Sequence, residues 1–362
     1  MKKLAIALVS PTEESVPPQK YGGTELVIYN LAEELVKKGH KVYLLASGNS
    51  KTSAELLPIF EKGIREYKEA NNMRKREIMK LMAIGKMLKI LQTIKVDVVH
   101  NHWGWRLLPF FDLITYPVVT TLHGPTDYED QKIAYDPFKE ANYVSISDNQ
   151  RKGNPHLNYI KTVYNGIDMN QFEFSDKKGN YFAFLGRISS EKGPKEAILT
   201  AKKAGVHLKI AAKIDAVDTE FFEKEIKGLI DGKQIEFIGE IGPEEKNEFL
   251  KNAAGLIAPI QWEEPFGLYF IEAMACGTPV ISFKRGSVPE LVKDKETGFI
   301  CEVNNMEQMS ESVKNLWQMP EKEYAKMRYD SRRHVEKNFS REKMTNEYEK
   351  VYQEIVNKKA LP

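Results

Sequence analysis

The sequence predicts an α/β protein made of two doubly wound, Rossmann-like domains that face a central cleft. Its 362 residues are enough for two domains of ordinary size. Strand-like and helix-like segments alternate along the chain, and the alternation starts again in the second half with its own first strand and glycine turn. Ligands of open parallel sheets bind beyond the carboxyl ends of the strands, so we expect the cleft to hold the site.

Short apolar runs predict the strands of the first half. The run at residues 4–9 is too short for a signal peptide and lacks a small-residue cleavage site, so we expect a buried first strand. Leucines spaced along residues 24–38 predict an amphipathic helix that ends at Gly39. The other strands of this half are expected at residues 41–46, 96–100, 118–122, 143–146 and 162–164.

The second half repeats this alternation. A strand at residues 181–185 precedes a helix at 194–204, and a second helix is expected at 267–276. The other strands of this half are expected at residues 208–212, 235–238, 255–258 and 279–283. Polar residues 172–180 predict a linker. We therefore expect domains at residues 1–170 and 171–340, and a helical, mostly polar tail from Met319 onward.

Composition argues against several classes of function. A net charge of +2 gives no reason to expect nucleic acid as a partner. Cys276 and Cys301 have no metal-ligand spacing, and so few cysteines indicate a reducing compartment, which we expect to be the cytoplasm. No apolar stretch is long enough to span a bilayer.

Residues 64–95 interrupt the alternation with a long, basic, amphipathic segment. Ile78, Leu81 and Met82 can share one face, while lysines and arginines crowd another region. One interpretation is a pair of surface helices packed on the first sheet. The other is a docking surface for anionic lipid headgroups, which would place the protein at the inner face of a membrane.

Two glycine turns follow the first strands of the two halves. Gly22 and Gly23 allow close backbone approach, and the helix N-terminus behind them favours an anion. Because they do not form a G-x-G-x-x-G fingerprint, they support a dinucleotide site poorly, and a plain turn is the alternative. Arg187 and Lys192, five residues apart in the second turn, suit a diphosphate; solvated loop charges are the alternative.

The segment from Glu264 to Glu272 carries the strongest chemical signal. The helix expected there presents its first backbone amides near Phe266, Gly267 and Leu268, where they can bind an anionic group. Glu272 lies in an otherwise apolar helix, and a carboxylate there requires polar partners. Hydroxyls of a sugar and a ribose would supply them. The alternative is a capped core helix with one satisfied glutamate.

Taken in their order along the chain, these motifs resemble the family-4 retaining glycosyltransferases, also called group 1 glycosyl transferases, which have the GT-B fold. The segment from Glu264 to Glu272 is similar to the glutamate–seven residues–glutamate motif of that family. No single motif is specific, whereas their joint order is. The other similar segments are residues 22–25, His123-Gly124, residues 163–168, the pair Arg187 and Lys192, and residues 273–281, 286–290 and 297–299.

The resemblance implies a role for each matching residue. Arg187 and Lys192 would bind the diphosphate of a nucleotide-sugar donor, and Glu264 would bind hydroxyls of the transferred sugar. His123 would contact the sugar near the reacting centre, although a lone histidine at a strand end is often structural. Together these four would be the catalytic residues. The other donor-binding residues would be Gly22, Gly23, Gly239, Ile241, Phe266, Gly267, Leu268 and Glu272.

The resemblance also implies the reaction. The acceptor hydroxyl would attack on the face from which the diphosphate leaves, so the sugar would retain its configuration. Cations would stabilise the departing charge, and neither a metal nor a cofactor is expected, because the sequence has no D-x-D motif or zinc-type histidine cluster. UDP-glucose or a similar UDP-sugar is the favoured donor, and GDP-mannose the alternative.

The acceptor would be a hydroxyl of a glycan, a lipid or a small molecule, and would bind to the first domain. The family also returns its final helix, about residues 341–362, to that domain. Trp103, Trp105, Asp127 and Tyr128 are candidates for acceptor contact, although the tryptophans can equally be packing residues. Competing hypotheses are another enzyme on this fold, such as a sugar-nucleotide epimerase, and a non-catalytic surface-binding protein.

Overall fold

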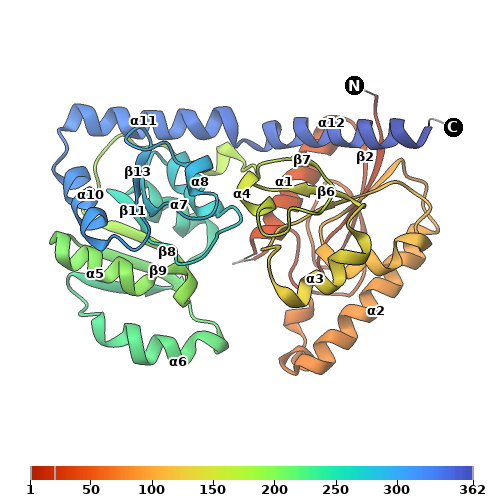
Figure 1. Cartoon of the computed structure of the whole chain (residues 1–362), viewed down its shortest axis with the longest axis horizontal. Helices are drawn as coiled ribbons and strands as arrows, with labels where there is room; N and C mark the ends of the chain where they lie inside the picture. Colours follow the sequence, from red (N-terminus) through yellow and green to blue (C-terminus); the bar gives the residue numbers. More distant parts are fainter. Residues whose placement is uncertain (1, 20–21, 361–362) are drawn as a thin grey trace. The chain divides into compact units, whose positions relative to one another are not determined.

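A computed structural model describes residues 2–19 and 22–360 of the chain. The chain divides into two compact units (Figure 1). The first unit comprises residues 1–166 and 341–362, and the second comprises residues 167–340. Each unit is an α/β structure with one parallel sheet of its own.

The first unit is built on a seven-stranded parallel sheet in the order β3-β2-β1-β4-β5-β6-β7. β1 lies inside the sheet, and the chain extends it first on one side and then on the other, as in a doubly wound fold. The strands are β1 Ala5–Val9, β2 Lys41–Ala46, β3 Glu55–Pro58, β4 Val98–Asn101, β5 Val118–Thr121, β6 Asn142–Ser145 and β7 Tyr159–Thr162.

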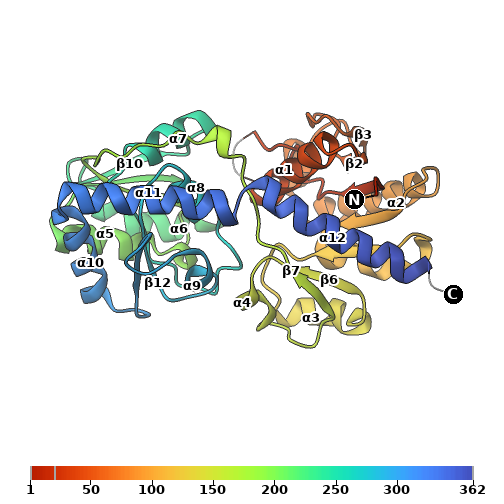
Figure 2. The ribbon, with the colours of Figure 1, turned by 90° about the horizontal axis from the view of Figure 1, so that it is seen from above.

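Helices cover this sheet with their apolar faces. α1 (Gly23–Lys37) buries Val27, Ile28 and Leu31, which recur at helical spacing. The C-terminal helix α12 (Arg341–Ala360) runs beside α1 (Figure 2), and Lys38 and His40, just after α1, contact Glu349 of α12 at 3.0 and 2.8 Å. The remaining α-helices of the unit are α2 Met73–Leu91, α3 Glu129–Tyr135 and α4 Asp148–Arg151.

The second unit contains a six-stranded parallel sheet in the order β10-β9-β8-β11-β12-β13. Its strands are β8 Phe182–Arg187, β9 Leu208–Lys213, β10 Ile235–Gly239, β11 Gly255–Ala258, β12 Val280–Phe283 and β13 Gly298–Cys301. Its α-helices are α5 Pro194–Ala204, α6 Thr219–Phe221, α7 Pro243–Lys251, α8 Leu268–Ala275, α9 Val288–Leu291, α10 Met306–Gln318 and α11 Glu321–Asn338. The prediction of two doubly wound α/β domains is confirmed.

Local chemistry explains the sharp boundaries of α5. Pro194 occupies its first turn, where a missing N–H costs nothing, and Gly205 ends it in the left-handed region at φ 72°. Gly193, which precedes the helix, has φ 72°, and a Cβ there would lie 2.1 Å from the Pro259 carbonyl oxygen. Only glycine therefore allows the loop before α5 to pass this close to the loop after β11.

Several expectations were wrong in detail. The strand expected at residues 162–164 lies at 159–162, and the short strands β3 and β13 were not predicted. The basic segment forms two 3-10 turns and one helix, α2, rather than a helix pair. Residues 172–180, expected as a linker, lie within the second unit: Ser175 N donates to Cys276 O, and Arg332 donates to Phe172 O.

None of the helices within residues 2–19 and 22–360 combines the length and the apolar character needed to cross a bilayer.

Candidate functional site

In the second unit, the strand order reverses between β8 and β11. β8 pairs with β9 on one side and with β11 on the other, and ligands of such sheets bind outside the carboxyl ends at this point. The loops that leave these two strands are held together, since Gln261 N donates to Glu191 O at 2.7 Å. Arg187 ends β8, and Glu264 lies in the loop after β11.

Lys192 and Glu264 meet at this place. The Lys192 ammonium is hydrogen bonded to Glu264 Oε2, although the two residues are far apart in sequence. Trp262 Nε1 donates to the same oxygen at 3.1 Å, and the ammonium also lies 5.2 Å and 5.0 Å from the ring centroids of Trp262 and Tyr269. Glu264 is only 6% exposed, so pairing and hydrogen bonding offset the cost of burying its charge.

Arg187 lies at the same sheet edge and is half-buried between two carboxylates. Its Nε is 3.1 Å from Asp218 Oδ2, and its terminal nitrogen is 3.3 Å from Glu191 Oε2. The acidic residues orient a planar, permanently charged guanidinium beside the switch point. Arg187 and Lys192 therefore both lie at the carboxyl end of β8, where two cations can face one anionic ligand.

Helix α8 begins at Leu268, four residues after Glu264. Gly267 has φ 79°, and a Cβ there would lie 2.6 Å from the Phe270 ring, so the tight entry into the helix requires glycine. Ser287 Oγ donates to Phe266 O at 2.6 Å and fixes the loop. The first backbone amides of α8, near Leu268, are thus held next to the Lys192–Glu264 pair, where the helix dipole favours negative charge.

Glu272 lies in the middle of α8 and is 4% exposed. The sequence indicated that it needs a polar partner, and the structure supplies one: Lys246 Nζ of α7 donates to Glu272 Oε1 at 2.6 Å. Sequence reasoning did not find Lys246, because the contact joins two helices that are adjacent only in the fold. Gly239 (φ 80°) ends β10, and Ile241 follows it in the loop before α7.

In the first unit, the strand order reverses between β1 and β4, and the residues predicted there lie on nearby loops. Gly22 precedes α1, and a Cβ on it would lie 2.7 Å from Pro18 Cβ; Gly23 is the first residue of α1. His123 follows β5 and is partly buried. Loss of solvent around the ring lowers the pKa of His123 to about 4, so its imidazole is neutral at pH 7.

A second histidine, which sequence reasoning missed, contacts His123. His102 follows β4, and its Nδ1 lies 2.9 Å from His123 Nε2. A His-x-His pair at residues 100 and 102, at the end of an expected strand, was the signal available for it. The first unit thus holds a buried group of imidazoles at the carboxyl end of its sheet.

The two tryptophans proposed for acceptor contact differ in how deeply they are buried. Trp103 is buried in the hydrophobic core of the first unit, whereas Trp105 is partly buried and stacks against the Arg106 guanidinium at 4.5 Å. Trp103 is therefore a packing residue, because a side chain enclosed by the core cannot stack on a sugar. Tyr128 is 43% exposed.

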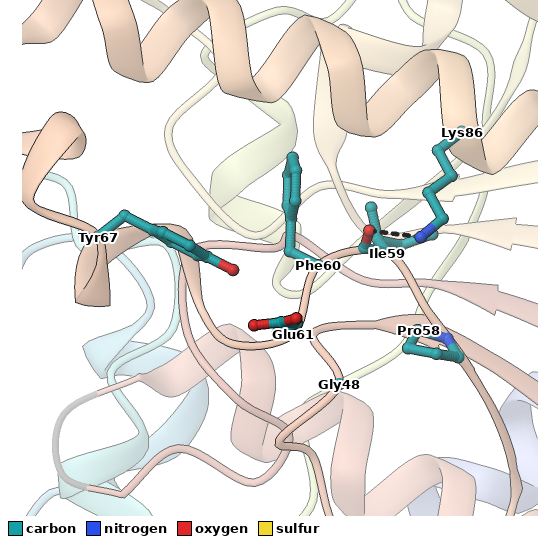
Figure 3. A pocket seen from close by; sticks show the side chains of 7 residues that line it. All are labelled: Gly48, Pro58, Ile59, Phe60, Glu61, Tyr67 and Lys86. Carbon is teal, nitrogen blue, oxygen red and sulfur yellow. Dashed lines mark hydrogen bonds between the residues drawn. The ribbon is translucent and has the colours of Figure 1, made fainter.

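The first unit also has an open cavity of about 560 Å³ beyond the end of β3 (Figure 3). None of the predicted site residues lines it. Lys86 Nζ donates to Ile59 O at 2.9 Å across one wall, so this amine already has a partner. The cavity is lined by Gly48, Pro58, Ile59, Phe60, Glu61, Tyr67 and Lys86.

Two family descriptions match adjoining parts of the chain. Residues 21–171 match "Glycosyltransferase Family 4", and residues 168–334 match "Glycosyl transferases group 1". Together they span both units and every residue of the Lys192–Glu264 site. The chain belongs to the group 1 glycosyltransferases of family 4. Enzymes of this family transfer a glycosyl group from a nucleotide sugar. Such a donor carries phosphates and hydroxyls, and the second unit has cations and a carboxylate together at the carboxyl end of its sheet.

Known proteins similar to this glycosyltransferase span nearly its whole length. N-acetyl-alpha-D-glucosaminyl L-malate synthase of Bacillus anthracis is 24% identical, with 92% of this chain and 94% of that protein aligned. Sucrose-phosphate synthase of Thermosynechococcus elongatus superimposes with a TM-score of 0.82 at 17% identity, covering 98% of this chain and 100% of that one.

A third similar structure was solved with a sugar nucleotide. HepE of Anabaena, in complex with UDP-glucose, superimposes with a TM-score of 0.75 at 14% identity, covering 97% of this chain and 100% of that one. Structural likeness at such low identity demonstrates the fold alone, which is the GT-B fold of this family.

Proposed function

We propose that the chain is a retaining, metal-independent hexosyltransferase that takes its sugar from a UDP-sugar, with UDP-glucose as the first candidate. The observation that carries the proposal is the contact between Lys192 and Glu264 beside Arg187, at the strand-order reversal of the second unit. The UDP-glucose bound to HepE supports this choice of donor. GDP-mannose is the alternative, since the loop at Gly239 and Ile241 would meet the base mainly through backbone groups.

The proposed chemistry assigns the departing charge to the protein's cations. As the bond between sugar and phosphate breaks, negative charge grows on the diphosphate, and Arg187, Lys192 and the amides at the start of α8 stabilise it. Because these groups are held in place before reaction, no reorganisation is required at the transition state. The acceptor hydroxyl attacks on the same face, and the leaving phosphate takes its proton.

The carboxylates position the donor in this proposal. Glu264, held by Lys192 and Trp262, accepts hydrogen bonds from hydroxyls of the transferred sugar, and Glu272 accepts from the ribose. We assign His123 a contact with the transferred sugar. Lys246 pairs with Glu272 and orients it, so we propose Lys246 as a supporting residue of the ribose contact.

A donor panel tests the proposal. The protein is incubated with UDP-glucose, UDP-N-acetylglucosamine and GDP-mannose, with and without EDTA, while thermal stability and release of nucleoside diphosphate are measured. We expect UDP-glucose to raise the melting temperature and to be hydrolysed slowly at a rate that EDTA does not change. Product that retains its anomeric configuration supports the mechanism, whereas interconversion of the donor without transfer supports an epimerase.

Replacing Lys192 provides the sharpest single test. We expect Lys192→Ala to lower kcat/KM by at least about tenfold, because a cation that faces the growing charge contributes more than 1.4 kcal/mol. Lys195→Ala is the matched control: it removes a nearby exposed lysine that pairs with Glu225. Equal kinetics in the two variants would exclude the diphosphate role of Lys192.

We also propose that α2 holds the enzyme against an anionic bilayer, which would suit a lipid-linked acceptor. On its outer face, Met73, Ile78, Leu81 and Met82 are between 53% and 67% exposed. Residues 64–95 contain nine lysines or arginines and three glutamates. Exposed apolar side chains flanked by cations are typical of helices that lie in a membrane interface.

Sedimentation with vesicles tests this contact. We expect the protein to bind phosphatidylglycerol vesicles, to bind phosphatidylcholine vesicles weakly, and to dissociate as salt is raised. The double variant Leu81→Gln/Met82→Gln should lose at least about tenfold in affinity, since about 25 cal/mol per Å² of apolar burial is removed. Ile133→Gln, at a 78% exposed position of α3, is the control and should bind normally. Equal binding to phosphatidylglycerol and phosphatidylcholine vesicles would overturn the proposal.

A further inference from the structure

We infer that His102 is a positioning residue that holds His123 in the tautomer with its proton on Nδ1, so that His123 presents an N–H donor to its ligand. The inference rests on the proposed function in one respect, that the ligand of His123 is a sugar hydroxyl. The arrangement of the two rings stands on the structure alone. Their Nδ1 and Nε2 atoms, 2.9 Å apart, form one hydrogen bond and therefore share one proton.

The position of His102 is determined by backbone and side-chain contacts. Its backbone N donates to Val9 O at the end of β1, at 2.9 Å, and its ring lies 3.8 Å from that of His100 between centroids. His102 is only 2% exposed and therefore cannot itself touch a ligand. His123 is partly exposed, and its Nε2 is engaged by His102, so Nδ1 is the nitrogen that remains for a ligand.

A second layer fixes His100 behind this pair. His100 Nδ1 lies 2.7 Å from the Tyr352 hydroxyl, and His100 Nε2 lies 2.7 Å from Thr121 Oγ1. The Tyr348 hydroxyl lies 2.9 Å from the same threonine oxygen. Both tyrosines belong to α12, so the C-terminal helix supports the histidines through Thr121 and His100.

The direction of the shared proton follows from the other nitrogen of His102. His102 Nε2 is buried and has no hydrogen-bond partner among the described residues. If that nitrogen carried the proton, a buried N–H would be unpaired, which proteins tolerate less well than an unpaired acceptor. The proton of His102 is therefore on Nδ1, where it is donated to His123 Nε2, and the proton of His123 lies on Nδ1.

The shared proton between His102 and His123 requires neutral rings, and all three imidazoles are neutral at pH 7. Burial is the main cause that lowers the pKa of His100, His102 and His123 below the usual value of histidine. The other titratable groups that face them are the hydroxyls of Tyr348 and Tyr352, whose pKa values burial raises. No charged side chain contacts these rings within the described part of the unit.

Nitrogen-15 NMR of the imidazole rings tests the inference on the whole protein at pH 7, without donor. We expect His123 to carry its proton on Nδ1, which is opposite to the Nε2 tautomer that free histidine favours. His102→Phe keeps a ring of similar size but removes the donor, so His123 should revert to Nε2–H. His102→Asn places an amide N–H where Nδ1 was and should restore the Nδ1 tautomer.

Kinetics link the tautomer to turnover. With UDP-glucose as the probe, we expect His102→Phe to lower kcat by about tenfold with KM nearly unchanged, and His102→Asn to recover most of the loss. A wild-type His123 protonated on Nε2, or one that keeps Nδ1–H in His102→Phe, would overturn the inference. If His102→Phe fails to fold, the wild-type spectrum and His102→Asn still decide. If His123→Ala turns over normally, the proposed sugar contact fails while the NMR result stands.

Discussion

Glu25 lies in the first turn of α1, next to Gly22, and is buried. Among residues 2–19 and 22–360, no cationic side chain contacts it. Burial is the main cause that raises the pKa of this carboxyl to about 7, although its own backbone N–H opposes the shift. A carboxyl whose pKa is raised in the folded state contributes most stability when protonated, below about pH 4.5. That contribution is lost as the pH rises towards 7.

Glu25→Gln should therefore change how stability depends on pH. The neutral amide cannot ionise, so we expect the variant to match wild type near pH 4 and to be more stable by about 1–3 kcal/mol at pH 8. Thermal unfolding between pH 4 and pH 8 measures the difference. Glu61→Gln, at an exposed position, is the control and should follow the wild-type curve. Parallel curves for Glu25→Gln and wild type would refute the assignment.

Among the helices, α11 is attached to the rest of the second unit by Arg328 and Arg332, and Arg328 is the more deeply buried of the two. Arg328 is completely buried, and its guanidinium donates to the carbonyl oxygens of Ser175, Ala253, Lys251 and Cys276 at 2.6–3.2 Å. These carbonyls lie at the ends of α7 and α8 and in the segment that we expected to be a linker. One side chain thus supplies hydrogen-bond donors to backbone carbonyls that the ends of these elements leave unpaired.

Arg328→Met should destabilise the protein by about 3–5 kcal/mol, because the buried carbonyls lose their donors while the side-chain volume is kept. Arg328→Lys should recover little, since a single ammonium cannot span the four oxygens. Urea unfolding measures both. Arg333→Met, on the exposed side of the same helix, should change stability by less than about 0.5 kcal/mol. A similar loss in Arg333→Met would show that helix propensity, not these contacts, explains the effect.

The chain as a whole has one contiguous unit and one that is completed by its C-terminal helix. Residues 167–340 contain a complete sheet and core, whereas residues 1–166 lack α12, which buries Tyr348, Val351, Tyr352 and Ile355 in the first unit. We expect residues 167–340 alone to unfold cooperatively. Residues 1–166 alone should not, because removing α12 exposes these side chains and breaks the contacts of His40 and His100.

Calorimetry on the two fragments measures this outcome. Residues 1–166 mixed with a peptide of residues 341–362 provide the control and should regain a transition. Cooperative unfolding of residues 1–166 without the peptide would mean that the first unit folds without α12.

The elements of this chain were largely predictable because their signals are local. Apolar runs and glycine or proline at their ends located β2, α5 and β11 within the bounds that the structure has. β3 was missed because its residues are only half-buried or exposed, and β13 because it is a short run between polar loops. The prediction at residues 162–164 failed because the edge strand β7 is only partly buried, so no apolar alternation marks its start.

By itself, the sequence determined the fold class, the family and the residues from Glu264 to Glu272, because periodicity and motif order are properties of neighbouring positions. Only the tertiary structure decided the partners: Lys192 for Glu264, Lys246 for Glu272, and His102 for His123. The two members of each pair are distant in sequence and meet only in the folded unit. Burial makes an unpaired charge or N–H costly. The partner that the fold supplies therefore determines how each carboxylate is oriented and which nitrogen of His123 carries the proton.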